Sequence, residues 1–114
     1  MRFRASEATR EPELAELLQL DDAGFRARFR GSPIKRIGRD RFVRNALLGA
    51  GNAQDSSLLQ GVIALLDDPS PLVRGMAVWA SRRLAGAEQE ANLRERFYDR
   101  ESDGQVRSEW DVLL

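Results

Sequence analysis

Apolar residues recur at helical spacing along most of this chain. From residue 12 onward they fall at positions i, i+3, i+4 and i+7, the pattern of a helix with one buried face. These stripes predict helices at about residues 12–20, 22–30, 40–50, 55–66, 71–84, 88–99 and 103–113. No segment shows the alternation of apolar and polar residues that marks a strand. The pattern therefore predicts an all-α protein with about six or seven helices.

Residues that start or stop helices punctuate this pattern. Ser70 followed by Pro71 is a strong start signal, a capping hydroxyl and then a proline in the first turn. Gly49 and Gly51 predict the end of the helix that begins near Asp40. Between the second and third helices, residues 32–38 are rich in glycine and proline, so we expect them to form an exposed loop.

A repeat appears when the helices are aligned. Three predicted helix caps, Asp40, Ser70 and Asp103, are each followed three residues later by Val-Arg, at spacings of 30 and 33 residues. Apolar residues follow each Val at four and seven positions, and these are Leu47, Ala77 and Trp110, then Ala50, Ala80 and Leu113. Such a period predicts a HEAT-like α-solenoid of stacked antiparallel helix pairs. In that register Arg44, Arg74 and Arg107 are equivalent, and we expect all three to bond to the turn before their helix.

Length and composition narrow the possible functions. The 114 residues suit one domain, predicted at residues 13–114, with residues 1–12 as a lead-in or the cut edge of a larger protein. Cysteine and histidine are both absent, which excludes disulfides, the usual zinc sites and nucleophiles that need a thiol or an imidazole. We expect no cofactor and no catalysis from this chain alone. Without a membrane-length apolar run or a signal sequence, we expect a cytoplasmic monomer.

Positive charge is concentrated in one stretch. Residues 26–44 contain eight Lys or Arg residues and one acid, Asp40, whereas the whole chain has 18 basic and 18 acidic residues. The window carries a charge of +7 and the remainder −7. A solvated charged face is the ordinary interpretation of a charge run. The segregation of sign favours contact with a polyanion, and nucleic acid is the hypothesis.

Five residues are the candidate contacts. Lys35, Arg36, Arg39 and Arg41 are predicted to contact phosphates, because Arg can donate two N–H groups to one phosphate and Lys supplies a point charge. Asn45 is a candidate for reading a base edge, with a hydrogen bond to neighbouring backbone as the equally plausible alternative. Helix geometry weakens Arg26, Arg28 and Arg30 as contacts. Trp110 lies on the core stripe, while the role of Trp79 stays open.

Several motifs resemble a known family. Residues 31–45 (GSPIKRIGRDRFVRN), continuing to 50–52 (AGN), resemble the C-terminal region of epoxyqueuosine reductase. Residues 65–74 (LLDDPSPLVR) and 106–110 (VRSEW) fit the HEAT-like repeats that close that family. The first block is specific, whereas the later motifs occur in many HEAT-like proteins.

The resemblance implies a tRNA-modification enzyme as the parent protein. That family reduces epoxyqueuosine to queuosine at the wobble position, using cobalamin and two [4Fe-4S] clusters bound N-terminal to the matched region. This chain lacks the cluster cysteines, so it would be catalytically silent. The implied role is an accessory domain that positions the tRNA anticodon stem-loop for an N-terminal catalytic region. The alternative is a HEAT-like protein–protein adaptor without a nucleic-acid role.

Overall fold

The computed structural model describes residues 10–113, and side chains from residue 13 onward. This part of the chain contains α-helices and short 3-10 helices and no strand, so the all-α prediction is confirmed. Residues 10–113 contain seven α-helices, in agreement with the predicted six or seven. They are α2 (Arg10–Leu18), α3 (Asp22–Arg28), α4 (Arg39–Ala53), α5 (Leu59–Ala64), α6 (Pro71–Leu84), α7 (Ala87–Phe97) and α8 (Gly104–Asp111). The 3-10 helices are η1 (Pro33–Ile37), η2 (Ser56–Leu58) and η3 (Leu65–Asp67).

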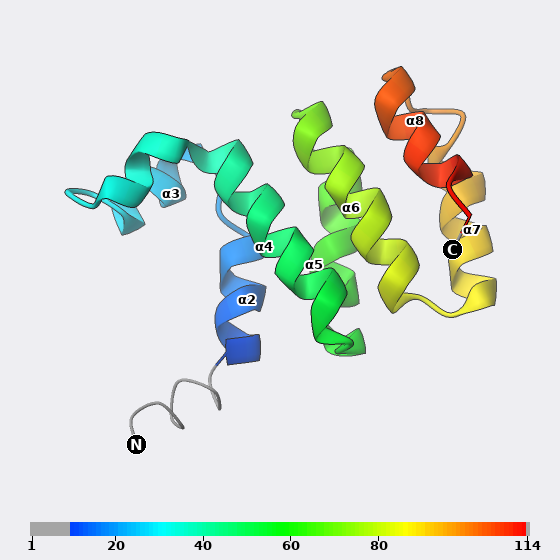
Figure 1. Ribbon diagram of the computed structural model, residues 1–114, viewed down its shortest axis with the longest axis horizontal. Helices are drawn as coiled ribbons and strands as arrows, with labels where there is room; N and C mark the ends of the chain where they lie inside the picture. The colour runs from blue at the N-terminus through cyan, green and yellow to red at the C-terminus, as the bar shows by residue number, and fades with distance from the viewer. Residues whose placement is uncertain (1–9, 114) are drawn as a thin grey trace.

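The helices form two layers. In Figure 1, α4, α6 and α8 lie in a row and run in the same direction, with their N-terminal ends along the upper edge. Helix α4 packs on α6, and α6 packs on α8. Helices α2, α5 and α7 run in the opposite direction behind this row, and α2 contacts α4 while α5 contacts α6. The HEAT-like classification of this arrangement stays a prediction.

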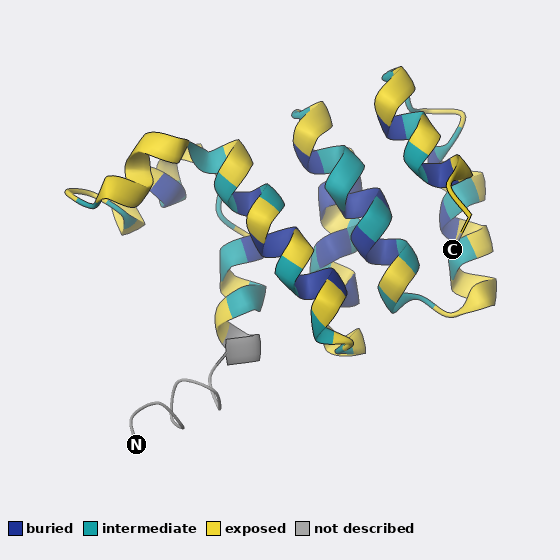
Figure 2. Ribbon diagram, in the orientation of Figure 1, coloured by how far each residue is buried: buried dark blue, intermediate teal, exposed yellow. Residues whose placement is uncertain are grey.

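The core lies between the two layers. Most of its fully buried members come from the predicted stripes, and Val43, Leu47, Val62, Val73 and Trp110 are among them. Val78 and Ser81 of α6 are also fully buried, although they lie outside the predicted stripe. Figure 2 shows the buried positions on the faces that the helices turn toward one another. Burial of these side chains contributes about 1.5–3 kcal/mol each relative to exposure, which is what holds short helices in place.

Helices α4 and α6 approach closely at Gly51. A Cβ atom added there would lie 2.4 Å from a ring carbon of Trp79. Gly51 was predicted to end its helix with Gly49, but α4 continues to Ala53 and ends at Gln54 in the left-handed conformation. The prediction was wrong because Gly51 is required by helix packing rather than by a turn. Trp79, whose role was open, is therefore a packing residue.

The repeat register is only partly confirmed. Ser70 and Asp103 cap their helices as predicted: the Ser70 hydroxyl accepts a hydrogen bond from Val73 N, and the Asp103 carboxylate accepts from Gln105 N and Val106 N. Asp40 is not a cap, because α4 begins one residue earlier, after Gly38, and has no side-chain cap. The last stripe position also fails, since Leu113 is 93% exposed and lies beyond the end of α8.

Residues 22–41 form an arm that extends away from the row of helices at the N-terminal end of α4, seen at the left of Figure 1. Phe25 and Phe29 of the arm pack against Phe42 of α4 in a small aromatic cluster, with ring centroids 4.8–5.4 Å apart. Asp21 caps α3 by accepting a hydrogen bond from Gly24 N at 2.7 Å. Within the predicted loop, residues 33–37 are exposed and Ser32 and Gly38 are partly buried, and the segment forms the 3-10 helix η1 instead of an irregular loop.

Candidate nucleic-acid interface

The arm presents a group of cations to solvent. Lys35 and Arg36 lie in the last turn of η1, and Arg41 lies in the first turn of α4. All three side chains belong to exposed residues, and none of them forms an ion pair with another described residue. The exposure predicted for these residues is therefore observed. Whether they contact nucleic acid stays a prediction.

The pairing of cations differs sharply along the chain. From residue 13 onward, most Lys and Arg side chains contact a carboxylate, a backbone carbonyl or an aromatic ring. Within the described residues, the cations without such a partner all lie between residues 30 and 44, and they are Arg30, Lys35, Arg36, Arg41 and Arg44. These side chains are the ones whose charge is not already used inside the molecule.

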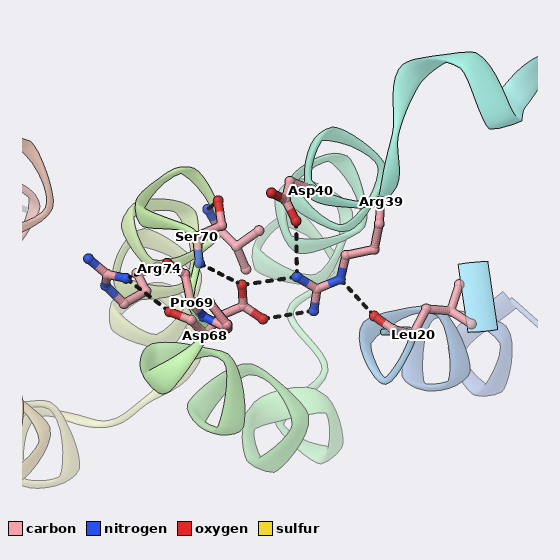
Figure 3. Close-up of polar contacts among 8 residues, drawn as sticks. Leu20, Arg39, Asp40, Asp68, Pro69, Ser70 and Arg74 are labelled. Carbon is pink, nitrogen blue, oxygen red and sulfur yellow. Dashed lines mark hydrogen bonds and ion pairs between the residues drawn. The ribbon is translucent and has the colours of Figure 1, made fainter. Parts of the chain in front are cut away.

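Arg39 has an internal role instead. Its side chain is 13% exposed, and its guanidinium forms two hydrogen bonds to the Asp68 carboxylate, at 2.7 and 2.9 Å. The Nε atom donates to the Leu20 carbonyl oxygen at 2.8 Å, and Nη1 also contacts Asp40 at 3.2 Å. Figure 3 shows Arg39 between the turn after α2 and the turn before α6. Since its donors are engaged, we leave Arg39 out of the contact set.

The Asp68 carboxylate organises the turn before α6. Its side chain is only 6% exposed, and it also accepts a hydrogen bond from Ser70 N at 3.0 Å. Burial raises the pKa of Asp68, but hydrogen bonds from Arg39 and Ser70 and the charges of Arg39 and Arg74 together outweigh it. The pKa therefore lies below its ordinary value, and the ionised carboxylate stabilises the fold.

The same arrangement recurs one unit later. Arg74 forms two hydrogen bonds of 2.9 Å to the Glu101 carboxylate, which also accepts from Asp103 N at 2.9 Å. The hydrogen bond from Arg74 lowers the pKa of Glu101 more than burial raises it. In both cases the carboxylate lies two residues before the helix cap. It joins an arginine of one helix in the row to the N-terminus of the next helix, from α4 to α6 and from α6 to α8. We call these two arrangements the clamps.

Only one of the three equivalent arginines bonds as predicted. Arg74 donates to the carbonyl oxygens of Asp68 and Pro69 in the preceding turn. Arg107 instead stacks on Tyr98, with its guanidinium carbon 4.6 Å from the ring centroid. Arg44 makes one long contact, 3.5 Å to the Asn45 amide oxygen, and its Nε is buried without a partner. The prediction was therefore wrong for Arg44 and Arg107. Arg44 also does not bind the carboxylate before the next helix, as Arg74 does, because Arg39 binds Asp68 there.

Asn45 lies one turn after Arg41 on the exposed side of α4. That position leaves its amide accessible and does not support the alternative of a hydrogen bond to neighbouring backbone. That Asn45 reads a base edge stays a prediction.

Arg30 was discounted from helix geometry, yet it is exposed and unpaired, while Arg26 pairs with Asp22 at 3.1 Å. Sequence reasoning missed the signal that separates the two arginines. Asp22 lies four residues before Arg26 and can pair with it, whereas no carboxylate lies at that spacing from Arg30.

Two shallow hollows continue from the arm along the N-terminal edge of the helix row. The first lies between α4 and α6, and its lining includes Ile37, Arg41, Pro71 and Leu72. The second lies between α6 and α8 and includes Arg44, Met76, Gln105 and Glu109. Pro71 and Leu72 line both hollows, so the hollows adjoin.

Other chemistries find no support in the described residues. No group of three or more carboxylates is placed to hold a metal ion there. None of the helices between residues 10 and 113 combines the length and apolar character needed to cross a bilayer. The interface of cations and hollows is therefore the strongest candidate site in the part of the chain that the structure covers.

Comparison with known proteins identifies the relatives of this chain. Epoxyqueuosine reductase of Pseudomonas aeruginosa is 38% identical over 82 residues, which cover 71% of this chain and 23% of that protein. The chain is related to the epoxyqueuosine reductases. The enzyme of Xanthomonas campestris is 40% identical over 82 residues, and that of Listeria monocytogenes is 32% identical over 103 residues, or 90% of this chain. The resemblance seen in the motifs is thus confirmed.

The match covers a minor part of each relative. The chain spans between a fifth and about a quarter of the length of these epoxyqueuosine reductases. No family model matches the chain, and no solved structure matches it. Sequence similarity to this one enzyme family therefore provides the external evidence for function.

Proposed function

We propose that this chain is a tRNA-binding accessory region of an epoxyqueuosine reductase. In this role it holds the anticodon stem-loop while a catalytic region, N-terminal to the matched part and carrying cobalamin and two [4Fe-4S] clusters, reduces epoxyqueuosine to queuosine. The proposal includes the HEAT-like classification, a cytoplasmic location and a monomeric chain. The similarity to epoxyqueuosine reductases supports the link to that enzyme, and the distribution of unpaired cations supports the tRNA-binding role.

One observation carries the proposal: among the side chains that the structure describes, from residue 13 to residue 113, the unpaired cations are confined to residues 30–44. An exposed cation without an internal partner can neutralise a phosphate without first breaking a contact. In a protein with no net charge, such confinement directs a polyanion to one surface. Arg30, Lys35, Arg36 and Arg41 are the proposed phosphate contacts, with Asn45 beside them on α4.

The experiment measures binding of an RNA anticodon stem-loop to the full chain by fluorescence anisotropy. Each of K35A, R36A and R41A should weaken binding by about 0.5–1 kcal/mol, or roughly two- to fivefold, as expected for exposed charge contacts. The triple variant should lose more than any single one. R96A is the matched control, because Arg96 is an exposed cation on α7 that already stacks on Phe97.

The outcomes separate the proposal from its rival. Loss of affinity in the arm variants, with R96A unchanged, supports a tRNA-binding role. Equal affinity of the wild type and the triple variant would contradict it and would favour the adaptor hypothesis. Phosphate contacts position RNA without specifying its sequence, so these variants should weaken binding to all stem-loops alike.

A further inference from the structure

The two hollows on the N-terminal edge form a path that leads away from the arm. Arg41 stands in the first hollow and Arg44 in the second, and Leu72 lies in the wall that both share. Leu72 is 41% exposed and Ile37, in the first hollow, is 43% exposed. Each hollow therefore contains a cation, and an exposed apolar side chain lies in the wall between them.

Arg44 is the residue that points to a ligand. Its Nε is buried and has no hydrogen-bond partner, and the only polar contact of the side chain with a described residue is the long one to Asn45. A buried N–H without an acceptor is costly and uncommon in folded proteins. An anion in the second hollow would neutralise the charge of Arg44, and it would supply the missing acceptor once the side chain turns toward it.

We propose that an unpaired RNA segment crosses this edge, with phosphates at Arg41 and Arg44 and an unpaired base or sugar against Leu72. This inference rests on the proposed function and specifies the form of RNA that the site takes. Unpaired nucleotides suit the path because their base faces are available for apolar contact, whereas a duplex keeps its bases stacked inside.

The acids that line the hollows are mostly engaged. Asp40 contacts Arg39, Asp22 pairs with Arg26, and the Asp103 carboxylate caps α8. Glu109 is the exception, because it lines the second hollow and its carboxylate pairs with none of the described cations. A phosphate bound near Arg44 would be repelled by Glu109. Removing the charge of Glu109 should therefore strengthen RNA binding, whereas removing that of Arg44 should weaken it.

The test compares two RNA probes of equal phosphate number, a stem-loop and a blunt duplex, on the full-length chain. R44Q should weaken stem-loop binding about threefold or more and make the salt dependence shallower by roughly one phosphate contact. L72S should weaken stem-loop binding by about threefold and leave duplex binding unchanged, because only unpaired bases can contact Leu72. E109Q should strengthen stem-loop binding.

Two controls keep the inference falsifiable. R44K retains the charge and should bind more tightly than R44Q, and E95Q removes an exposed carboxylate of α7 and should bind as the wild type does. If R44Q unfolds, L72S and E109Q still test the path, since they alter an exposed and a partly exposed side chain. Wild-type binding of both probes by L72S and E109Q would overturn the inference. If the arm variants were still weakened, the proposed function would stand; if they also bound normally, both would fail.

Discussion

Replacement of Arg39 by alanine separates a structural arginine from a binding one. The change removes both hydrogen bonds to Asp68 and the bond to the Leu20 carbonyl oxygen. It leaves a carboxylate that is only 6% exposed without its cation. Breaking a buried ion pair on one side costs about 3–5 kcal/mol.

We expect the lower end of that range for R39A. The Arg39 side chain retains 13% exposure, so water can reach the site, and Asp68 keeps its hydrogen bond from Ser70 N. A loss of about 3 kcal/mol would be a large part of the 5–15 kcal/mol typical of a domain. For a chain of 114 residues it lowers the melting temperature by roughly 10–15 °C.

Urea unfolding followed by far-UV circular dichroism measures this loss. R41A is the matched control, because Arg41 is an exposed arginine in the same first turn of α4, and it should change stability by less than about 0.5 kcal/mol. In a double-mutant cycle, D68A should cost much less in the R39A background than in the wild type. A loss below about 1 kcal/mol for R39A, or an equal loss for R41A, would refute the assignment of the clamp.

Two further changes probe the fold. Because the pKa values of Asp68 and Glu101 are lowered in the folded state, their stabilisation is present above the unfolded-state pKa of about 4 and is lost as the pH falls through the folded-state values. The melting temperature should thus fall as the pH drops from about 5 toward 3, and less steeply in D68N/E101Q; parallel curves would argue against the clamps. G51A should cost about 1–3 kcal/mol, since its Cβ would overlap the Trp79 ring, whereas G49A in the same helix meets only an ordinary contact at 3.6 Å and should not destabilise.

The helices and most of the core could be predicted from the sequence because their signals are local. The stripe through Val73 and Ala77 fixes one face of α6, and Ser70 with Pro71 fixes its start. Where a local signal had two meanings, the prediction failed. Gly51 carries the same signal as a helix stop, but only the position of Trp79, 28 residues later, shows that it permits close packing.

The site was less predictable, because pairing depends on contacts between distant residues. Arg39 and Arg41 are the same residue type and lie two positions apart. Arg39 nevertheless binds Asp68, 29 residues later in the sequence, while Arg41 is exposed to solvent. The repeat register made Arg44 equivalent to Arg74, but no rule of spacing shows that Arg39 takes the clamp in the first unit. The positive charge of residues 26–44 could be predicted from the sequence. Which of these cations remain unpaired could be learned only from the fold.

The most direct test of the account is the salt dependence of RNA binding. The full chain and its K35A/R36A/R41A variant are titrated with an anticodon stem-loop at several salt concentrations. With phosphates neutralised by Arg30, Lys35, Arg36 and Arg41, log K should fall against log salt with a slope of roughly −3 to −4, and the variant should retain a slope of about −1. A further phosphate at Arg44 would make both slopes steeper by about 1 and leave the difference between them unchanged. R39A, measured below its melting temperature, should keep the wild-type slope. A flat response in the wild type, or equal slopes for the wild type and the triple variant, would contradict the claim that the arm binds RNA.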